Sequence, residues 1–340
     1  REGQSTFNFL KRRFPHLQID TADQKDGPDY LTKIVNYQII IKTPGISPHL
    51  PEIAAAKKNK KLITSQTQIF SELCPGKIIG ITGTKGKSTT ASLIYHVLHE
   101  NQIPSLLVGN IGKPVLDYLD EITPRTWVVC ELSSYQLMDL KHSPHVAVLQ
   151  NIVPDHLDYH KDFKEYKNAK LNITKYQSPD DYFISQLNVP TQAKKIIFGL
   201  PNKPVTSKLL GRHNQLNIQP AVIIGRLLKI PGPKIFSAIK IFPMLEHRLE
   251  LIATKKSIRF YSDTLATIPE ATIAAIDTLN QTTLIAGGHE RKQKYALLAK
   301  KILSSDIRTL ILFPSTGPRL WQEINSPKIK HFLVNSMSEA

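Results

Sequence analysis

The segment Lys77–Asn101 constrains the fold of this chain more than any other. An apolar run over Lys77–Thr82 leads into a turn with two glycines, and an amphipathic stretch over Thr89–Asn101 follows. This order predicts a strand, a loop and a helix, in which backbone N–H groups and a helix N-terminus form an anion site. Lys87 would contact the β- and γ-phosphates of a nucleotide, and the Ser88 hydroxyl would bind Mg²⁺. The predicted nucleotide-binding residues are Gly83, Thr84, Lys85, Gly86, Lys87, Ser88 and Thr89.

The loop departs from the strict phosphate-loop pattern at one position. That pattern, G-x-x-x-x-G-K-[ST], requires a glycine where this chain has Ile81. The remaining G-x-x-G-K-S occurs often by chance, so a lysine-rich turn without a ligand is the alternative. The strand before the loop and the helix after it favour nucleotide binding.

The rest of the chain alternates short apolar runs with amphipathic stretches, which indicates α/β units with parallel sheets. We expect further strands at Leu17–Ala22, Tyr37–Lys42, Trp127–Leu132, Val146–Ile152, Ile258–Ser262, Thr283–Ala286 and Thr309–Phe313. We expect further helices at Ser5–Arg13, Phe163–Thr174 and Asn214–Leu228. The 340 residues suffice for two or three domains. Shifts in composition predict three, at residues 1–68, 69–244 and 245–340.

Charge and composition narrow the possible partners. The chain has 44 Lys and Arg against 28 Asp and Glu, a net charge of +16, which favours anionic partners. The lysines are scattered and do not alternate with aromatic residues, so we expect a solvated surface and no nucleic-acid partner. No apolar run approaches the roughly 18 residues of a spanning helix, so no membrane partner is expected. Two cysteines, Cys74 and Cys130, cannot form a disulfide framework, and a reducing compartment is expected.

Acidic and histidine side chains follow two of the predicted strands. Glu131 ends the strand that begins at Trp127, and Asp155 and His156 follow the strand that begins at Val146. In an open parallel sheet these strand ends face the ligand crevice, so we expect Glu131 to lie near Ser88. A lone acid or histidine after a strand is usually a cap or a surface residue. Two successive strands that deliver such residues beside a phosphate loop favour a metal site.

Lys170 occupies an unusual position in its predicted helix. It is spaced from Phe163, Tyr166 and Ile173 so as to lie on the apolar face. Desolvation disfavours the ammonium form, so such a lysine would have a lowered pKa and be nucleophilic toward CO₂. The alternative is that the ammonium group extends past the helix into water.

Several motifs together resemble the Mur ligase family, whose ATP loop is similar to Thr82–Thr89. Five further stretches also resemble motifs of this family: Val108–Gly112, Glu131–Leu137, Asn151–Asp158, Gly211–Asn217 and Glu246–Glu250. The resemblance covers essentially the whole chain. It implies three α/β domains: a Rossmann-like N-terminal domain for the UDP substrate, a central ATP-binding domain with a P-loop-type parallel sheet, and a Rossmann-like C-terminal domain for the amino acid. The phrase E-L-S-S-[FY]-Q-L resembles the branch that adds D-glutamate to UDP-N-acetylmuramoyl-L-alanine.

The resemblance also implies cofactors and roles. ATP and two Mg²⁺ ions are expected, with Ser88, Glu131, His156 and a carbamylated Lys170 as metal ligands. The implied catalytic residues are Lys87, Glu131, His156, Lys170 and Arg248. Asn214, Asn217 and Asp263 are implied to contact the nucleotide, and Asp23, Thr43, Gly45, Asn110 and Arg291 the substrates. A monomeric cytoplasmic enzyme of peptidoglycan synthesis is expected.

Three departures from the family pattern concern the substrate side. Leu265 and Arg291 stand where the family has lysines. The chain also begins where the first glycine-rich turn ends and stops before the last substrate segment, so we expect a fragment that lacks both ends. Three alternatives remain open: a sister ligase for another amino acid, a nucleotide-binding homologue without ligase activity, and a basic nucleic-acid binder.

Overall fold

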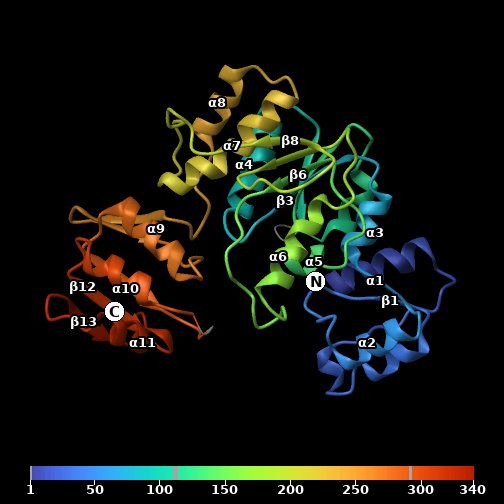
Figure 1. Cartoon of the computed structure of the whole chain (residues 1–340), viewed down its shortest axis with the longest axis horizontal. Coiled ribbons are helices and arrows are strands. Elements are labelled where there is room, and N and C mark those ends of the chain that lie inside the picture. Colours follow the sequence, from blue (N-terminus) through green and yellow to red (C-terminus); the bar gives the residue numbers. More distant parts are fainter. Residues whose placement is uncertain (1, 110–113, 291–292) are drawn as a thin grey trace. The chain divides into compact units, whose positions relative to one another are not determined.

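The computed structural model describes residues 2–109, 114–290 and 293–340 (Figure 1). The chain divides into two compact units. The first comprises residues 1–205 and 216–240, and the second comprises residues 206–215 and 241–340. In the described residues, no helix is both long enough and apolar enough to cross a membrane.

A six-stranded parallel sheet forms the centre of the first unit, with the strand order β4-β5-β3-β6-β7-β8. Its strands are β3 (Lys77–Thr82), β4 (Ser105–Gly109), β5 (Trp127–Glu131), β6 (Val146–Leu149), β7 (Tyr182–Ser185) and β8 (Lys194–Ile197). The four inner strands β5, β3, β6 and β7 are almost entirely buried. Their apolar runs therefore show no alternation, as is typical of a parallel sheet covered on both faces.

Helices and short 3₁₀ turns connect these strands, and two helices follow the last of them. The connecting helices are α4 (Lys87–Glu100), α5 (Ser134–Leu137) and α6 (Phe163–Leu171), and those that follow are α7 (Arg212–Leu227) and α8 (Gly232–Ile241). The 3₁₀ turns are η3 (Val115–Glu121) and η4 (Asn172–Thr174). Asp162 caps α6 by accepting a hydrogen bond from the backbone N–H of Glu165, the ordinary role of Asp at a helix start.

The N-terminal part of the first unit has a smaller core of its own. The strands β1 (Ile39–Ile41) and β2 (Leu62–Thr64) pair in parallel. The helices of this part are α1 (Glu2–Arg13), α2 (Pro51–Lys58) and α3 (Gln66–Leu73), with the 3₁₀ turns η1 (Gln24–Asp26) and η2 (Thr32–Asn36). Ile40 and Ile53 belong to the small core, whereas Phe9 of α1 and Phe70 of α3 pack into the core of the central sheet.

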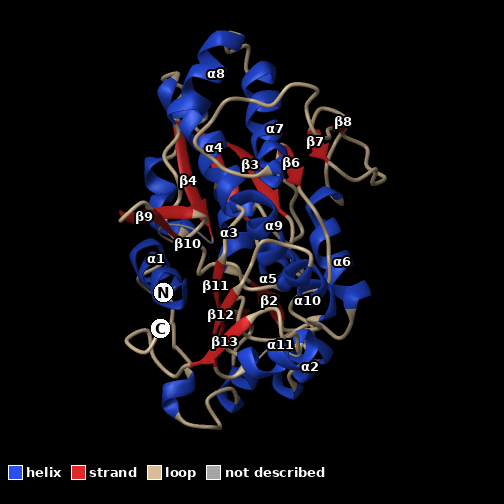
Figure 2. Ribbon diagram, turned by 90° about the vertical axis from the view of Figure 1, so that its left-hand side faces the viewer, coloured by secondary structure: helices blue, strands red, loops and turns tan. Residues whose placement is uncertain are grey.

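The second unit contains two separate sheets. A parallel sheet has the order β11-β12-β13, and its three strands run side by side in Figure 2. The other is an antiparallel pair of β9 and β10. The elements are β9 (Glu250–Lys255), β10 (Ile258–Ser262), α9 (Pro269–Leu279), β11 (Thr283–Gly287), α10 (Ala296–Leu303), β12 (Thr309–Phe313), α11 (Thr316–Ile324) and β13 (Lys330–Leu333).

Most predicted elements are present, but one strand is not. The segment Leu17–Ala22 forms no strand: Leu17 is 55% exposed and Gln18 donates a side-chain hydrogen bond to Asp20. The alternating apolar residues Leu17 and Ile19 do not make a strand where no neighbouring strand pairs with them. A second difference concerns Ile258–Ser262, which is a strand but belongs to the antiparallel pair and not to the parallel sheet. The predicted boundaries at residues 68 and 244 stay predictions.

Candidate active site

The topology of the central sheet brings three loops to one edge. The chain runs from β3 outward to β4 and returns through β5, then continues on the other side of β3 through β6 to β8. The strand order therefore reverses at β3, and ligands of such sheets bind beside the carboxyl ends of the strands at this point. Lys87 begins the helix after β3, Glu131 ends β5, and His156 lies in the loop after β6.

Two glycines give the loop after β3 its shape. Gly83 and Gly86 have φ values of 150° and 85°, which residues other than glycine rarely adopt. Gly86 caps the N-terminus of α4, and a Cβ atom there would lie 2.2 Å from the side-chain oxygen of Asn217. The backbone oxygen of Asn217 also accepts a hydrogen bond of 3.2 Å from Thr90 in α4. Asn217 is therefore beside the phosphate loop, where sequence analysis predicts a nucleotide contact.

The loop is fixed from the β6 side by Asn151. The backbone N–H of Thr84 donates to the Asn151 backbone oxygen over 2.7 Å. The side chain of Asn151 accepts from the backbone N–H of Lys85 and donates to its carbonyl, each over 3.0 Å. Asn151 belongs to the stretch Asn151–Asp158 that resembles a family motif, but the sequence does not predict this role. Its position directly after a strand next to β3 was the available signal.

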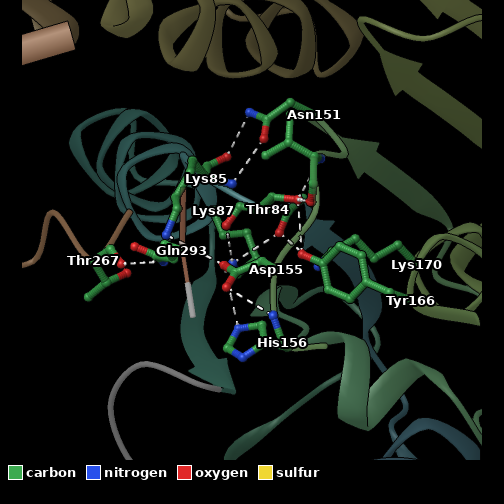
Figure 3. Close-up of polar contacts among 12 residues, drawn as sticks. Thr84, Lys85, Lys87, Asn151, Asp155, His156, Tyr166, Lys170, Thr267 and Gln293 are labelled. Carbon is green, nitrogen blue, oxygen red and sulfur yellow. Dashed lines mark hydrogen bonds and ion pairs between the residues drawn. The ribbon is translucent and has the colours of Figure 1, made fainter. Parts of the chain in front are cut away.

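Lys87 and Lys170 meet at the same carbonyl. Lys87 Nζ donates to the carbonyl oxygens of Gly83 and Thr84, each over 3.0 Å. Lys170 Nζ donates to the Gly83 carbonyl over 2.9 Å and lies 4.7 Å from the centre of the Tyr166 ring (Figure 3). The loop thus brings the amino groups of both lysines together at the Gly83 carbonyl.

Lys170 is buried on the same face as Tyr166 and Ile173, as the helical spacing predicted, whereas Phe163 is 36% exposed. Lys170 is 2% exposed, and Tyr166 and Ile173 are fully buried, so its amino group does not reach water. Burial lowers the pKa of Lys170 well below its usual range, and the charge of Lys87 lowers it further. Asp155 and Glu131 oppose this shift of the Lys170 pKa. A neutral amine is the form that reacts with CO₂.

Two acidic residues, Asp155 and Glu131, lie at the same edge of the sheet as the loop lysines and Lys170. Asp155 forms an ion pair of 3.6 Å with Lys85, and Glu131 is 1% exposed at the end of β5. The register places Glu131 opposite Ile81 of β3, one residue before the end of that strand. Ile81 itself is fully buried, which explains why an apolar residue replaces the first glycine of the strict pattern.

His156 has an uncommon backbone conformation and a defined side-chain partner. Its φ is 54°, in the left-handed region. Its backbone N–H donates to Asp155 over 3.0 Å, and its Nδ1 lies 2.7 Å from the Tyr135 hydroxyl. Burial lowers the pKa of His156, and the charges of Lys170 and Lys87 act in the same direction. A neutral imidazole is the form that binds metals.

The donor set at this edge fits magnesium bound together with phosphates. In the described part of the chain, no cluster of three or more His, Cys, Asp and Glu side chains could hold a metal ion. Mg²⁺ commonly uses one or two carboxylates, with waters and substrate phosphates completing its shell. Glu131 at the end of β5 and Ser88 at the start of α4 supply such a partial set beside the phosphate loop.

The second unit brings together two of its predicted residues. Asp263 accepts a hydrogen bond of 3.1 Å from the backbone N–H of Leu249. Burial raises the pKa of Asp263, and the charge of Arg248 opposes that rise. Leu265, which stands at a family lysine position, is 47% exposed. Asn214 lies at the start of α7, where its side chain donates to the Leu210 carbonyl over 2.6 Å.

The predicted substrate residues of the N-terminal part have local structural roles. Asp23 caps η1 in a capping box with Asp26. Thr43 and Gly45 form a turn, closed by the hydrogen bond from the Ile46 N–H to the Thr43 carbonyl. Asn110 and Arg291 lie outside the described residues.

Comparison with known proteins identifies the family. Residues 81–203 match the Mur ligase middle domain. The UDP-N-acetylmuramoylalanine–D-glutamate ligase of Ruminiclostridium cellulolyticum is 32% identical over 351 residues, which cover 93% of this chain and 75% of that protein. The chain belongs to the Mur ligase family. The ligase of the same name from Acetivibrio thermocellus is 33% identical over 328 residues, which cover 86% of this chain and 70% of that protein.

Solved structures of Mur ligases share the fold of this Mur ligase at low sequence identity. The MurF structure from Acinetobacter baumannii superposes with a TM-score of 0.66 at 17% identity, covering 89% of this chain and 82% of that one. The MurC structure from Thermotoga maritima superposes with a TM-score of 0.62 at 17% identity, covering 98% of this chain and 83% of that one. The predicted multi-domain α/β architecture of a Mur ligase is thereby confirmed.

Proposed function

We propose that this Mur ligase joins D-glutamate to UDP-N-acetylmuramoyl-L-alanine with hydrolysis of ATP, in the cytoplasmic synthesis of peptidoglycan precursors. The observation that carries the proposal is the identity of 32% and 33% to ligases of this name over most of the chain. The phosphate loop supports it, because that loop places Lys87 at the start of a helix beside two buried strand ends.

The proposed reaction has two steps. The γ-phosphoryl group of ATP is transferred to the alanine carboxylate, which gives an acyl phosphate and ADP. The amine of D-glutamate then attacks the acyl carbon, and phosphate leaves as the amide forms. Positioning and charge dominate phosphoryl transfer, so Lys87 serves by stabilising the negative charge on the transferred group.

We assign the metal ligands to residues at the carboxyl edge of the sheet. Ser88 and Glu131 would hold one Mg²⁺, and His156 with carbamylated Lys170 would hold a second. Magnesium supplies charge neutralisation to the phosphates when it is bound. The burial of Lys170 supports its carbamylation, because it favours the neutral amine, and the adjacent Gly83 carbonyl and Tyr166 ring leave the amino group no access to bulk water.

We assign nucleotide contacts to the loop residues, Asn214, Asn217, Arg248 and Asp263. The contact between Gly86 and Asn217 supports this for Asn217. The proximity of Arg248 to Asp263 supports a shared role for that pair in the second unit. We assign the UDP substrate to the N-terminal part, with Asp23, Thr43, Gly45 and Asn110, and an amino-acid contact to Arg291.

An amino-acid panel tests the substrate. Phosphate release from ATP is measured with UDP-N-acetylmuramoyl-L-alanine and one amino acid at a time. We expect release with D-glutamate and none with L-glutamate, L-lysine or the dipeptide D-alanyl-D-alanine. In a parallel assay with UDP-N-acetylmuramate in place of that substrate, release that depends on L-alanine would instead indicate a sister ligase. ATP-analogue binding without release under any condition would indicate a nucleotide-binding homologue.

A further inference from the structure

A tyrosine hydroxyl contacts the histidine that we assign to magnesium. Tyr135 belongs to α5, four residues after Glu131, and its hydroxyl lies 2.7 Å from His156 Nδ1. The two rings meet edge to face, with 5.2 Å between their centres.

The other ring nitrogen of His156 faces the site without a hydrogen-bond partner among the described residues. Its nearest acidic atom is Asp155 Oδ2 at 3.7 Å, beyond hydrogen-bond distance. The other carboxylate oxygen of Asp155 accepts the backbone N–H of His156, and Oδ2 itself pairs with Lys85. Asp155 therefore fixes the backbone of His156 and does not hold a proton on Nε2.

Tyr135 is itself held in place by aromatic neighbours. Its ring centre lies 4.1 Å from that of Tyr159 and 5.6 Å from that of the buried His160. The Tyr159 hydroxyl donates to the carbonyls of Pro44 and Ile46, at 2.9 and 3.2 Å. The Tyr135 ring is thus packed against a residue that is bound to the turn at Thr43–Ile46.

We propose that Tyr135 is a positioning residue for His156. Its hydroxyl accepts a hydrogen bond from Nδ1–H, which fixes the tautomer whose Nε2 lone pair is available to a divalent cation. A metal-binding histidine generally donates its other ring N–H to an oxygen in this way, and loss of such a partner weakens metal binding by about 10- to 100-fold. This inference rests on the proposed role of His156 as a magnesium ligand.

The test uses Tyr135→Phe, which removes one oxygen and keeps the ring. The full chain is labelled with ¹⁵N-histidine, and the His156 signals are identified by their loss in His156→Gln. In the unaltered chain we expect the Nδ1–H tautomer. In Tyr135→Phe we expect a shift to the Nε2–H tautomer, because the Nδ1–H would have lost its acceptor while Asp155 Oδ2 stays 3.7 Å from Nε2. The Mg²⁺ concentration that saturates binding of a non-hydrolysable ATP analogue should rise by about 10- to 100-fold.

Tyr176→Phe is the matched control, since Tyr176 is 45% exposed and contacts Lys175. It should keep both the tautomer and the Mg²⁺ dependence of the unaltered chain. The same His156 tautomer in the unaltered chain and in Tyr135→Phe would overturn the inference, as would an unchanged Mg²⁺ dependence. Neither readout uses the muramoyl substrate or D-glutamate, so a failure of the proposed ligase reaction is detected separately by the amino-acid panel.

Discussion

The central sheet and the three-stranded sheet of the second unit are both parallel, yet they differ in burial. Ile79 and Ile81 of β3 are fully buried, whereas Ile285 of β11 and Phe332 of β13 are 46% and 53% exposed. The register places Ile285 and Phe332 on either side of Ile311, on one face of the second sheet. The opposite face, with Leu310 and Leu312, packs into the core of that unit.

This difference in burial shows which of the two sheets holds the candidate active-site residues in place. Helices and loops cover both faces of the central sheet, and its carboxyl edge holds the phosphate loop through backbone and side-chain contacts of Asn151. In the second sheet the strand β13 is exposed along its length. Substitutions in the central sheet should therefore change activity and stability together, and substitutions on the open face of the second sheet should change neither by much.

The largest expected effect is that of Lys87→Ala on phosphoryl transfer. Removal of the loop ammonium group should lower ATP-dependent phosphate release by about 10²- to 10³-fold, because that charge is needed at the transferred phosphoryl group. Lys77→Ala is the control, since Lys77 begins the same strand at the opposite edge and lies over Trp127. Unchanged turnover of Lys87→Ala would refute the assignment of the loop.

Lys170→Ala should lose about 10²-fold in activity, and added short carboxylic acids should restore part of it. A small carboxylate fits the space of the deleted side chain and replaces the proposed carbamate at the metal. Phosphate release with and without acetate or propionate measures the rescue. Lys167 is an exposed lysine on the same helix. Lys167→Ala should keep its activity, and added carboxylic acids should not change it. Full activity of Lys170→Ala without added acid would remove the proposed role.

The burial difference itself is tested by two matched truncations. Ile79→Ala should lower the free energy of unfolding by about 2–5 kcal/mol, because it leaves a cavity between packed layers. Ile285→Ala should lower it by no more than about 1 kcal/mol, because nearly half of that side chain is already in water. Native-state hydrogen exchange of the amides in each sheet measures the two losses separately. Equal losses would show that the open face of the second sheet is covered in solution.

The last expected effect is on the pH dependence of stability. Because burial lowers the pKa of Lys170, the unfolded chain binds more protons than the folded chain between that lowered pKa and the ordinary lysine value. The free energy of unfolding should therefore rise with pH across this window. In Lys170→Met the rise should be shallower, and in Lys167→Met it should be unchanged. Urea unfolding in bicarbonate-free buffer between neutrality and about pH 10 gives the slopes, and identical slopes in all three chains would contradict the expectation.

The strands of the central sheet were predictable because their signal is local. A run of apolar residues followed by a glycine turn marks β3, and the predicted bounds Lys77–Thr82 are those observed. The prediction failed at Leu17–Ala22, where a strand would need a partner that local pattern does not reveal. For the same reason, local pattern indicated Ile258–Ser262 as a strand but not its antiparallel pairing with β9.

The candidate site was predictable in its residue types but not in its contacts. Helical spacing placed Lys170 on an apolar face and left two outcomes, burial or extension into water. Burial is observed, because the Gly83 carbonyl, 87 residues earlier in the chain, receives the amino group. Asn151 and Tyr135 were quoted in motifs without these roles, since their hydrogen bonds join segments that only the folded chain brings together.

The sequence by itself determined the phosphate loop, the parallel strands that flank it and the family of the chain, because glycine positions, apolar runs and ordered motifs are properties of neighbouring residues. The tertiary structure decided which carboxylates and amines share one edge of the sheet. Proximity between Lys170 and Lys87, or between Tyr135 and His156, depends on strand order and helix packing. The shifts in pKa follow from that proximity and from burial, both of which arise only when the sheet is assembled and covered.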